Sequence, residues 1–192
     1  MIFETIVTTV NPDGKPHIAP IGIHRRGELY IIAPFRPSTT LSNVEAAKSA
    51  VINTTDDVRV FAGCLTGRYE WPIQAAERIE GVRLTGALAH IEVRLESVEA
   101  DELRPRLICR AVHSANHAPF QGFNRAQAAV IEAAILISRL TMLPPEKIES
   151  EINYLRVAMD KTAGDAEREA WGWLMEKRDA HRAQHPDAGQ LV

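Results

Sequence analysis

Two tight-turn signals near the N-terminus separate three segments that are rich in β-branched residues. The first signal is Asn11-Pro12-Asp13-Gly14 and the second lies at Arg26-Gly27. Pro, Asn, Asp and Gly favour turns because they preset φ or tolerate unusual backbone angles. The flanking segments FETIVTTV, PHIAPIGIH and ELYIIA carry the Val, Ile, Thr and Tyr that are typical of strands. Two hairpins in succession predict an antiparallel meander.

The meander continues into a longer β-rich part. Further strands are predicted in AVINTT, DVRVFAGCL, RLTGALAHIEVRLESVEA and RPRLICRAVH, where Val, Ile, Thr and Leu recur with partial alternation. One helix is predicted in TLSNVEAAKSA, because good helix formers follow a run of Ser and Thr.

The last third of the chain has helical periodicity instead. NRAQAAVIEAAILISRLTM is rich in alanine and apolar residues, and Pro144-Pro145 is predicted to end this largely buried helix. A second helix is predicted in EKIESEINYLRVAMDKTA and a third in AEREAWGWLMEKRDAHRA, with a break at Gly164-Asp165. We therefore predict a β-rich body over residues 1–118 and a helical section over residues 119–192.

Charge and hydropathy exclude some classes of partner. The net charge of −3 and the pI near 6.2 give no basic surplus, so we expect neither nucleic-acid binding nor binding to an anionic membrane. No apolar segment approaches the roughly 20 residues that span a bilayer, and the N-terminus does not resemble a signal peptide. The two cysteines are too few for a disulfide framework and fit a reducing compartment, so we expect a cytoplasmic protein.

The junction APFRPSTTLSN, residues 33–43, is open to two interpretations. A single hydroxyl from Ser38, Thr39 or Thr40 suffices to cap the predicted helix. Three adjacent hydroxyls, with Arg36 upstream and Asn43 one turn into the helix, exceed that need. Together with the helix N-terminus they make a suitable site for a phosphate dianion. Both the helix cap and the phosphate site remain alternatives on spacing alone.

The order of several motifs resembles that of the FMN-binding split-barrel proteins, especially the flavin-reductase-like group. The matching segments are Thr8-Thr9, Ala19-Pro20, Thr40 with Asn43, and Val51 to Asn53. The motif GFNRAQAAVIEAAILISRL and the segment DKTAGDAEREA are similar to the helical extension of a flavin-reductase-like subfamily from archaea and methylotrophic bacteria. That subfamily is associated with tetrahydromethanopterin-linked one-carbon metabolism.

The resemblance implies a six-stranded antiparallel split β-barrel with a C-terminal helical section that packs on the barrel or at a dimer interface. It also implies a homodimer with FMN at the interface between subunits. The phosphate would be held by the APFRPSTTLSN junction, and the flavin ring and ribityl chain would lie beside the second strand and the end of the AVINTT strand. The implied FMN-binding residues are Ala19, Pro20, Ile21, Gly22, Arg36, Ser38, Thr39, Thr40, Asn43, Asn53 and Thr54.

FMN carries its own redox reactivity, so the chain needs no catalytic triad or carboxylate pair. We expect an FMN-dependent oxidoreductase that passes hydride between a small-molecule donor and acceptor. The alternative is a non-catalytic FMN-binding dimer that acts as a carrier or interaction partner in one-carbon metabolism, and pyridoxal phosphate is a further candidate ligand for the same barrel. No catalytic residue is assigned; His17, His24 and His113 are the candidates for a general acid.

Three other patterns carry alternatives of their own. Arg125, Glu132 and Arg139 are seven residues apart on one helix face, which predicts either a buried charge ladder or the lining of an anion site. Cys109, His113 and His117 recur every four residues, but RLICRAVH is predicted as a strand, so we predict no metal site. Cys64 is predicted to be a buried, unreactive thiol.

Overall fold

The computed structural model describes residues 1–185, which form two compact units. The first unit contains Met1–Asp56 and Tyr69–Phe120, and the second contains Asp57–Arg68 and the chain from Gln121 onward. The second unit therefore includes residues 57–68, which lie inside the range that the sequence assigns to the β-rich body.

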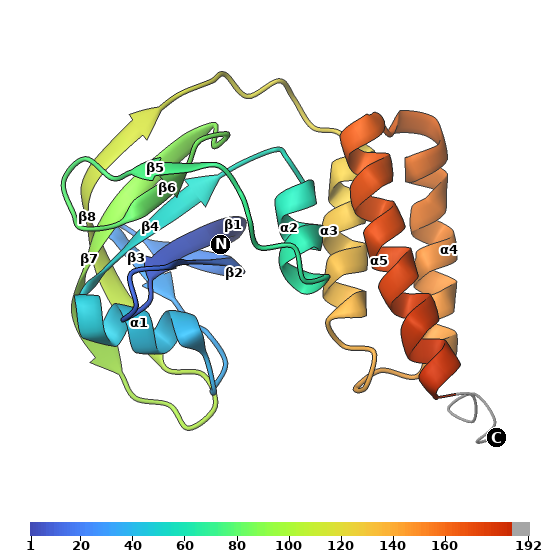
Figure 1. The fold of residues 1–192 in the computed structure, drawn as a ribbon, viewed down its shortest axis with the longest axis horizontal. Helices are drawn as coiled ribbons and strands as arrows, with labels where there is room; N and C mark the ends of the chain where they lie inside the picture. The colour runs from blue at the N-terminus through green and yellow to red at the C-terminus, as the bar shows by residue number, and fades with distance from the viewer. Residues whose placement is uncertain (186–192) are drawn as a thin grey trace. The chain divides into compact units, whose positions relative to one another are not determined.

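The first unit is built on a closed, six-stranded antiparallel barrel (Figure 1). Around the barrel the strands follow the order β1-β2-β3-β8-β7-β4. The two predicted N-terminal hairpins are present as the β1–β2 and β2–β3 pairs, and the predicted fold class is confirmed. The barrel strands are β1 (Ile2–Val10), β2 (Pro16–Arg26), β3 (Leu29–Ile32), β4 (Ser49–Thr54), β7 (Ala89–Glu99) and β8 (Arg106–Asn116).

The helix α1 (Thr39–Ala47) packs its apolar face into the barrel interior. Leu41 and Val44 are buried there among inward-facing residues of all six strands. Burying such a side chain fully stabilises the fold by roughly 1.5–3 kcal/mol. This core holds the N-terminus of α1 beside β1. Its buried members are Val7, Ile23, Ile32, Leu41, Val44, Ala50, Ile52, Val93, Leu107 and Cys109.

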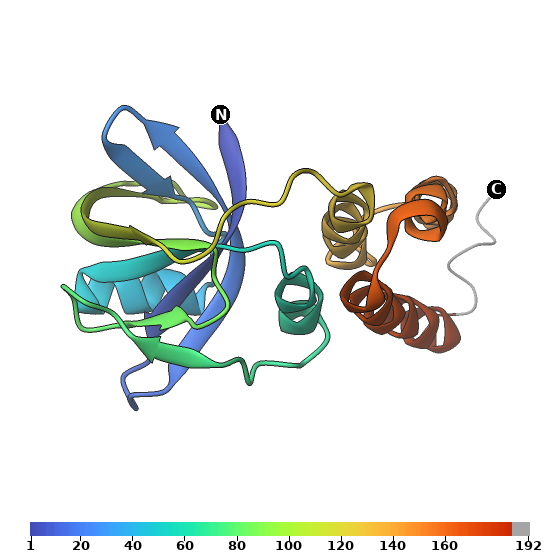
Figure 2. The same ribbon diagram turned by 90° about the horizontal axis from the view of Figure 1, so that it is seen from above.

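A two-stranded hairpin, β5 (Ile73–Ala75) and β6 (Val82–Leu84), covers the outer face of β1 and β4 (Figure 2). Val7 and Ile52 face the barrel core, so their neighbours Thr8 and Asn53 point outward. Both are nevertheless buried, because Thr8 Oγ1 donates to the carbonyl of Val82 and the Leu84 amide donates to Asn53 Oδ1 over 2.8 Å.

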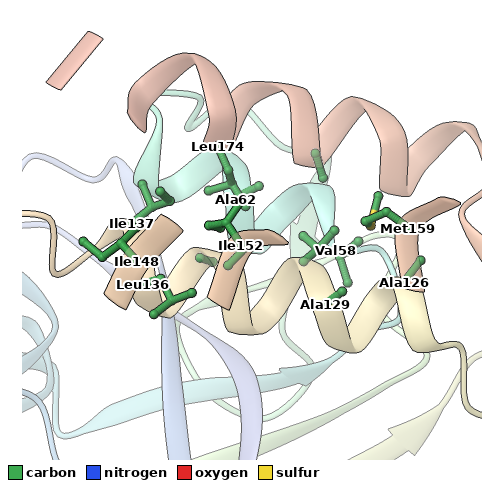
Figure 3. Packing of buried hydrophobic residues seen from close by; sticks show 14 residues of the cluster. Val58, Ala62, Ala126, Ala129, Leu136, Ile137, Ile148, Ile152, Met159 and Leu174 are labelled. Atoms are coloured by element: carbon green, nitrogen blue, oxygen red, sulfur yellow. The ribbon is translucent and has the colours of Figure 1, made fainter. Parts of the chain in front are cut away.

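The second unit is a bundle of α2 (Arg59–Leu65), α3 (Arg125–Ile137), α4 (Pro145–Thr162) and α5 (Asp165–Gln184). All four helices contribute to one apolar core (Figure 3). The predicted stripe on α4 lies in it, with Ile148, Ile152 and Met159 buried. Within residues 1–185, none of the helices combines the length and apolar character that a membrane span requires.

Two predicted elements are wrong. DVRVFAGCL forms the helix α2 and not a strand, because Val58 and Ala62, one helical turn apart, both pack into the bundle core. Asp57 Oδ1 accepts from the Arg59 amide over 3.1 Å at its start, which is a helix signal that the β-branched pattern obscured. The next helix, α3, ends at Ile137 and not at the proline pair, because the chain turns away after Ser138, whose Oγ donates to Ile135 O over 2.7 Å.

Candidate functional site

The N-terminus of α1 carries a side-chain cap. Ser38 has extended backbone angles (φ −148, ψ 127), and its Oγ accepts from the Leu41 amide over 3.3 Å. The capping interpretation of the junction is therefore correct for Ser38. The amides of Thr39 and Thr40 precede the first intrahelical bond, and no described residue accepts from them.

A cavity of about 500 Å³ opens at this helix end. Its lining contains three hydroxyls, two amide side chains and two prolines but no carboxylate, so an anion would meet no repelling charge there. The α1 macrodipole also favours a negative charge at this end. The lining residues are Asn11, Pro12, Pro37, Ser38, Thr39, Ser42 and Asn43.

Asn43 anchors the helix. Its side chain is buried, and Nδ2 donates to Thr9 Oγ1 over 2.9 Å and to Asn11 Oδ1 over 2.8 Å. Both amide hydrogens are thus used to tie α1 to the end of β1. Thr40 is also buried, at 2% exposure, whereas Thr39 is exposed. Of the predicted phosphate residues, Thr39 therefore presents the most accessible hydroxyl.

Ser42 belongs to this site, although it is absent from the predicted set. It is exposed, it lines the cavity, and its Oγ makes a long contact of 3.4 Å with Ser38 O. Ser42 follows Ser38 by four residues, and that spacing places two side chains on one helix face. The i,i+4 relation is the sequence signal that would have identified it.

Arg36 is not among the cavity-lining residues. It is exposed, and its backbone amide donates to Leu103 O over 2.9 Å. The neighbouring Arg104 holds the same segment, since its Nε donates to Ala33 O over 2.7 Å and its guanidinium lies 4.6 Å from the Phe35 ring centroid. The segment before α1 is thus fixed through the chain near residue 104.

The predicted segment Ala19 to Gly22 lies in the middle of β2, where it pairs with β1 and is half-buried. Thr5 Oγ1 donates to Ile21 O over 2.8 Å across this pair. A Cβ on Gly22 would lie 2.9 Å from Cγ2 of Ile2, closer than side chains tolerate. Close packing against Ile2 of β1 therefore favours glycine at this position.

Asn53 and Thr54 lie inside β4 and not in a turn. Asn53 is fully buried, and its Nδ2 donates to Ile6 O over 3.0 Å and to Thr8 Oγ1 over 3.2 Å, while Oδ1 accepts from the hairpin. Thr54 Oγ1 donates to Ala89 O over 3.2 Å. The barrel and its covering hairpin satisfy both side chains, which favours a structural role.

The remaining candidates are dispersed. His17 is half-buried on β2, where burial lowers the pKa of its imidazole, and His24 lines a separate cavity of about 430 Å³ with Arg26, Arg104 and Arg106. Neither histidine lines the cavity at α1. Burial raises the pKa of the Cys64 thiol to about 12, which agrees with an unreactive cysteine.

The predicted charge ladder on α3 is wrong. Arg125, Glu132 and Arg139 are all exposed, and no ion pair joins them within residues 1–185. The buried face of α3 is formed by alanine and aliphatic side chains instead, such as Ala129 and Ala133.

Two models of one protein family match most of the chain. Residues 3–118 match the family described as "Protein of unknown function (DUF447) N-terminal domain", and residues 124–176 match "Protein of unknown function (DUF447)". The chain belongs to the DUF447 family. No curated protein matches the chain.

Solved structures share all or part of the fold of this DUF447 chain. An FMN-bound DUF447 protein from Methanosarcina mazei is 23% identical, with a TM-score of 0.80 over 92% of this chain and 94% of that one. The 2-nitrobenzoate 2-nitroreductase of Pseudomonas fluorescens is 20% identical, with a TM-score of 0.53 over 59% of this chain and 64% of its own. Flavoredoxin from Methanosarcina acetivorans is 11% identical, with a TM-score of 0.53 over 60% and 69%. The resemblance to flavin-reductase-like split barrels is thereby confirmed at the level of the fold.

Proposed function

We propose that this DUF447 protein binds FMN, with the phosphate at the N-terminus of α1, and acts as an oxidoreductase of the flavin-reductase-like type. The observation that carries this proposal is the carboxylate-free cavity at that helix end. The FMN-bound family member from Methanosarcina mazei, which has the same fold, supports the identity of the ligand.

The groups at the cavity fit a phosphate. The Thr39 and Thr40 amides have no acceptor within the described residues, and the hydroxyls of Thr39 and Ser42 are exposed. Donors of this kind, at the positive end of a helix, are what a dianion requires. Asn43 contributes by holding α1 in place and not by donating to the ligand, since its amide hydrogens are occupied.

Bound FMN would supply hydride chemistry, so the residues of the chain only bind and orient it and admit a small-molecule donor or acceptor. We also propose that the active form is a homodimer. Large apolar side chains near the ends of β1 and β3, Ile2 (54% exposed), Phe3 (48%) and Phe35 (63%), support this, because exposed apolar groups of this size favour association.

The test is titration of the flavin-free protein with FMN, followed by flavin fluorescence. Thr39→Ala and Ser42→Ala should each weaken binding by about 1.5–3 kcal/mol, roughly ten-fold to more than a hundred-fold in Kd, because each removes a hydrogen bond to a charged group. Ser49→Ala is the matched control, since Ser49 lies beyond the opposite end of α1 and its Oγ donates to Ala47 O. Wild-type affinity in both cavity variants would refute the phosphate site.

Turnover is tested separately. Anaerobic addition of NADH or NADPH to the FMN-loaded protein should bleach the flavin absorption if the protein is an oxidoreductase. If FMN binds tightly but no donor reduces it faster than it reduces free FMN, the non-catalytic carrier is the better description.

A further inference from the structure

Five titratable side chains gather on the outer face of the barrel, away from the α1 cavity lining: Glu77, His90, Glu92, His113 and His117. Val93 packs into the barrel core, so His90 and Glu92 on the same strand β7 point outward. Both are nevertheless fully buried. The connection between β5 and β6 covers them, since three of its backbone amides bond to Glu92.

A β-bulge brings β8 into the same cluster. Glu92 pairs with His113 and Val93 pairs with Ala111, so Val112 is an extra residue and the side-chain alternation of β8 reverses there. Cys109 consequently faces the core while His113 faces outward with Glu92. This reversal removes Cys109 from any site that includes His113.

Glu92 is an ionised anchor. Its carboxylate accepts from the amides of Glu77 (2.5 Å), Arg78 (2.7 Å) and Ile79 (3.1 Å). Because three N–H donors occupy lone pairs on both oxygens, the geometry holds this carboxyl group as an acceptor. A carboxylate can only accept, so the proton between Glu92 Oε1 and His90 Nε2, 3.2 Å apart, belongs to the histidine.

That proton fixes the tautomer of His90. With Nε2 protonated, Nδ1 of the neutral ring is the nitrogen that carries a lone pair, and it faces His117 Nε2 over 2.8 Å. A carboxylate behind a histidine is the support that metal-binding histidines typically have, because it orients the ring and makes the other ring nitrogen a stronger ligand.

Two more potential ligands, Glu77 and His113, lie near His90. The Nε2 of His113 is 3.3 Å from Glu77 Oε2. That nitrogen is buried, yet it has no hydrogen-bond partner in the described structure, so the close approach is not a well-oriented hydrogen bond. A ligand atom from each of Glu77, His90 and His113 lies within 4.8 Å of the others. Two ligands of a tetrahedral ion at the usual Zn–N distance are about 3.3 Å apart, so the set needs only small side-chain movements to close.

We propose that Glu77, His90 and His113 bind a divalent transition-metal ion of the Zn²⁺ class, with Glu92 as the positioning residue of His90. Two imidazoles and one carboxylate suit such an ion and leave a coordination position open. His117 stacks on His90, with its Nε2 2.8 Å from His90 Nδ1.

The test is calorimetric titration of the untagged, chelator-treated protein with ZnCl₂. We expect one Zn²⁺ per chain, with affinity at least ten-fold weaker in Glu77→Gln and in His113→Gln. The Glu77 side chain is 54% exposed, so Glu77→Gln should fold normally, which circular dichroism checks.

His181→Gln is the matched control. His181 and His185 form a stacked pair one turn apart on and just after α5, which makes them a second place where two imidazoles could hold Zn²⁺. Unchanged affinity in His181→Gln supports the barrel site. The barrel site is refuted if the wild-type protein does not bind Zn²⁺. It is also refuted if Glu77→Gln and His113→Gln bind Zn²⁺ with wild-type affinity, or if only His181→Gln loses affinity.

Discussion

Replacing Glu92 by Gln should selectively loosen the chain that connects β5 and β6. The buried carboxylate accepts three backbone amides within three consecutive residues, 77–79. Gln keeps one acceptor oxygen and turns an NH₂ donor toward amides that are themselves donors. A hydrogen bond to a charged group contributes about 1.5–3 kcal/mol, and an unsatisfied buried donor costs about 1–3 kcal/mol. We therefore expect a local loss of about 2–4 kcal/mol.

The loss should depend on pH with a definite sign. Because the pKa of Glu92 is lowered on folding, its stabilisation is fully present above the pKa of about 4.3 of an unfolded Glu. It disappears as the pH falls through the lower, folded pKa, where the wild-type carboxyl becomes protonated. The difference between wild type and Glu92→Gln should thus be largest near neutral pH and shrink in acid.

Hydrogen–deuterium exchange is the assay, because it reads residues 77–79 directly and does not require the two units to unfold together. A loss of 2 kcal/mol corresponds to a roughly thirty-fold lower protection factor. Glu99→Gln is the control, since Glu99 is on the same strand but forms an exposed ion pair with Arg106. Protection of residues 77–79 that is equal in Glu92→Gln and wild type at pH 7 would show that the carboxylate does not hold this connection.

Two further substitutions test anchors elsewhere. Asn43→Ala should destabilise the barrel by about 2 kcal/mol, because it removes two hydrogen bonds at a buried position. If a denaturant titration shows a loss in the free energy of unfolding of less than about 0.5 kcal/mol, Asn43 does not anchor α1. Asn124→Ala should destabilise the helical unit by about 1–2 kcal/mol, because Asn124 Oδ1 accepts from the Ala126 amide at the start of α3 and Nδ2 donates to Thr162 O. Trp171 and Trp173 lie in this unit, so their fluorescence reports its unfolding. An unchanged unfolding transition would show that Asn124 does not stabilise the helix as a cap.

Much of this fold could be predicted because its signals are local. The turn at Asn11-Pro12-Asp13-Gly14 and the cap at Ser38 depend on residues within a few positions of each other. α2 was mistaken for a strand because Val58 and Val60 alternate as strand residues do, and only the bundle core reveals that Val58 and Ala62 share a helix face. Local preference gives way to tertiary packing at such short segments.

The histidine cluster could not be predicted because a bulge breaks the rule on which spacing arguments rest. In a regular strand, residues four apart point to the same side, so Cys109 and His113 would share a face. The extra residue Val112 reverses the alternation, and nothing in RLICRAVH identifies it as a bulge. His90, Glu92 and Glu77 come from other parts of the chain and meet His113 only through strand pairing and the covering hairpin.

At α1 the predicted segment does form a helix N-terminus beside a cavity, but the sequence does not show which of its residues anchor the helix and which line the cavity. Hydroxyl and amide side chains look alike in a motif, whereas burial separates them into anchors and accessible donors. Thr40 and Asn43 are buried, and both amide hydrogens of Asn43 donate to residues at the end of β1, so these residues hold the helix. Thr39 and Ser42 remain at the cavity surface. If the proposed phosphate site is correct, substitutions of the anchors should lower the stability of the barrel first, whereas substitutions of Thr39 and Ser42 should lower FMN affinity at unchanged stability.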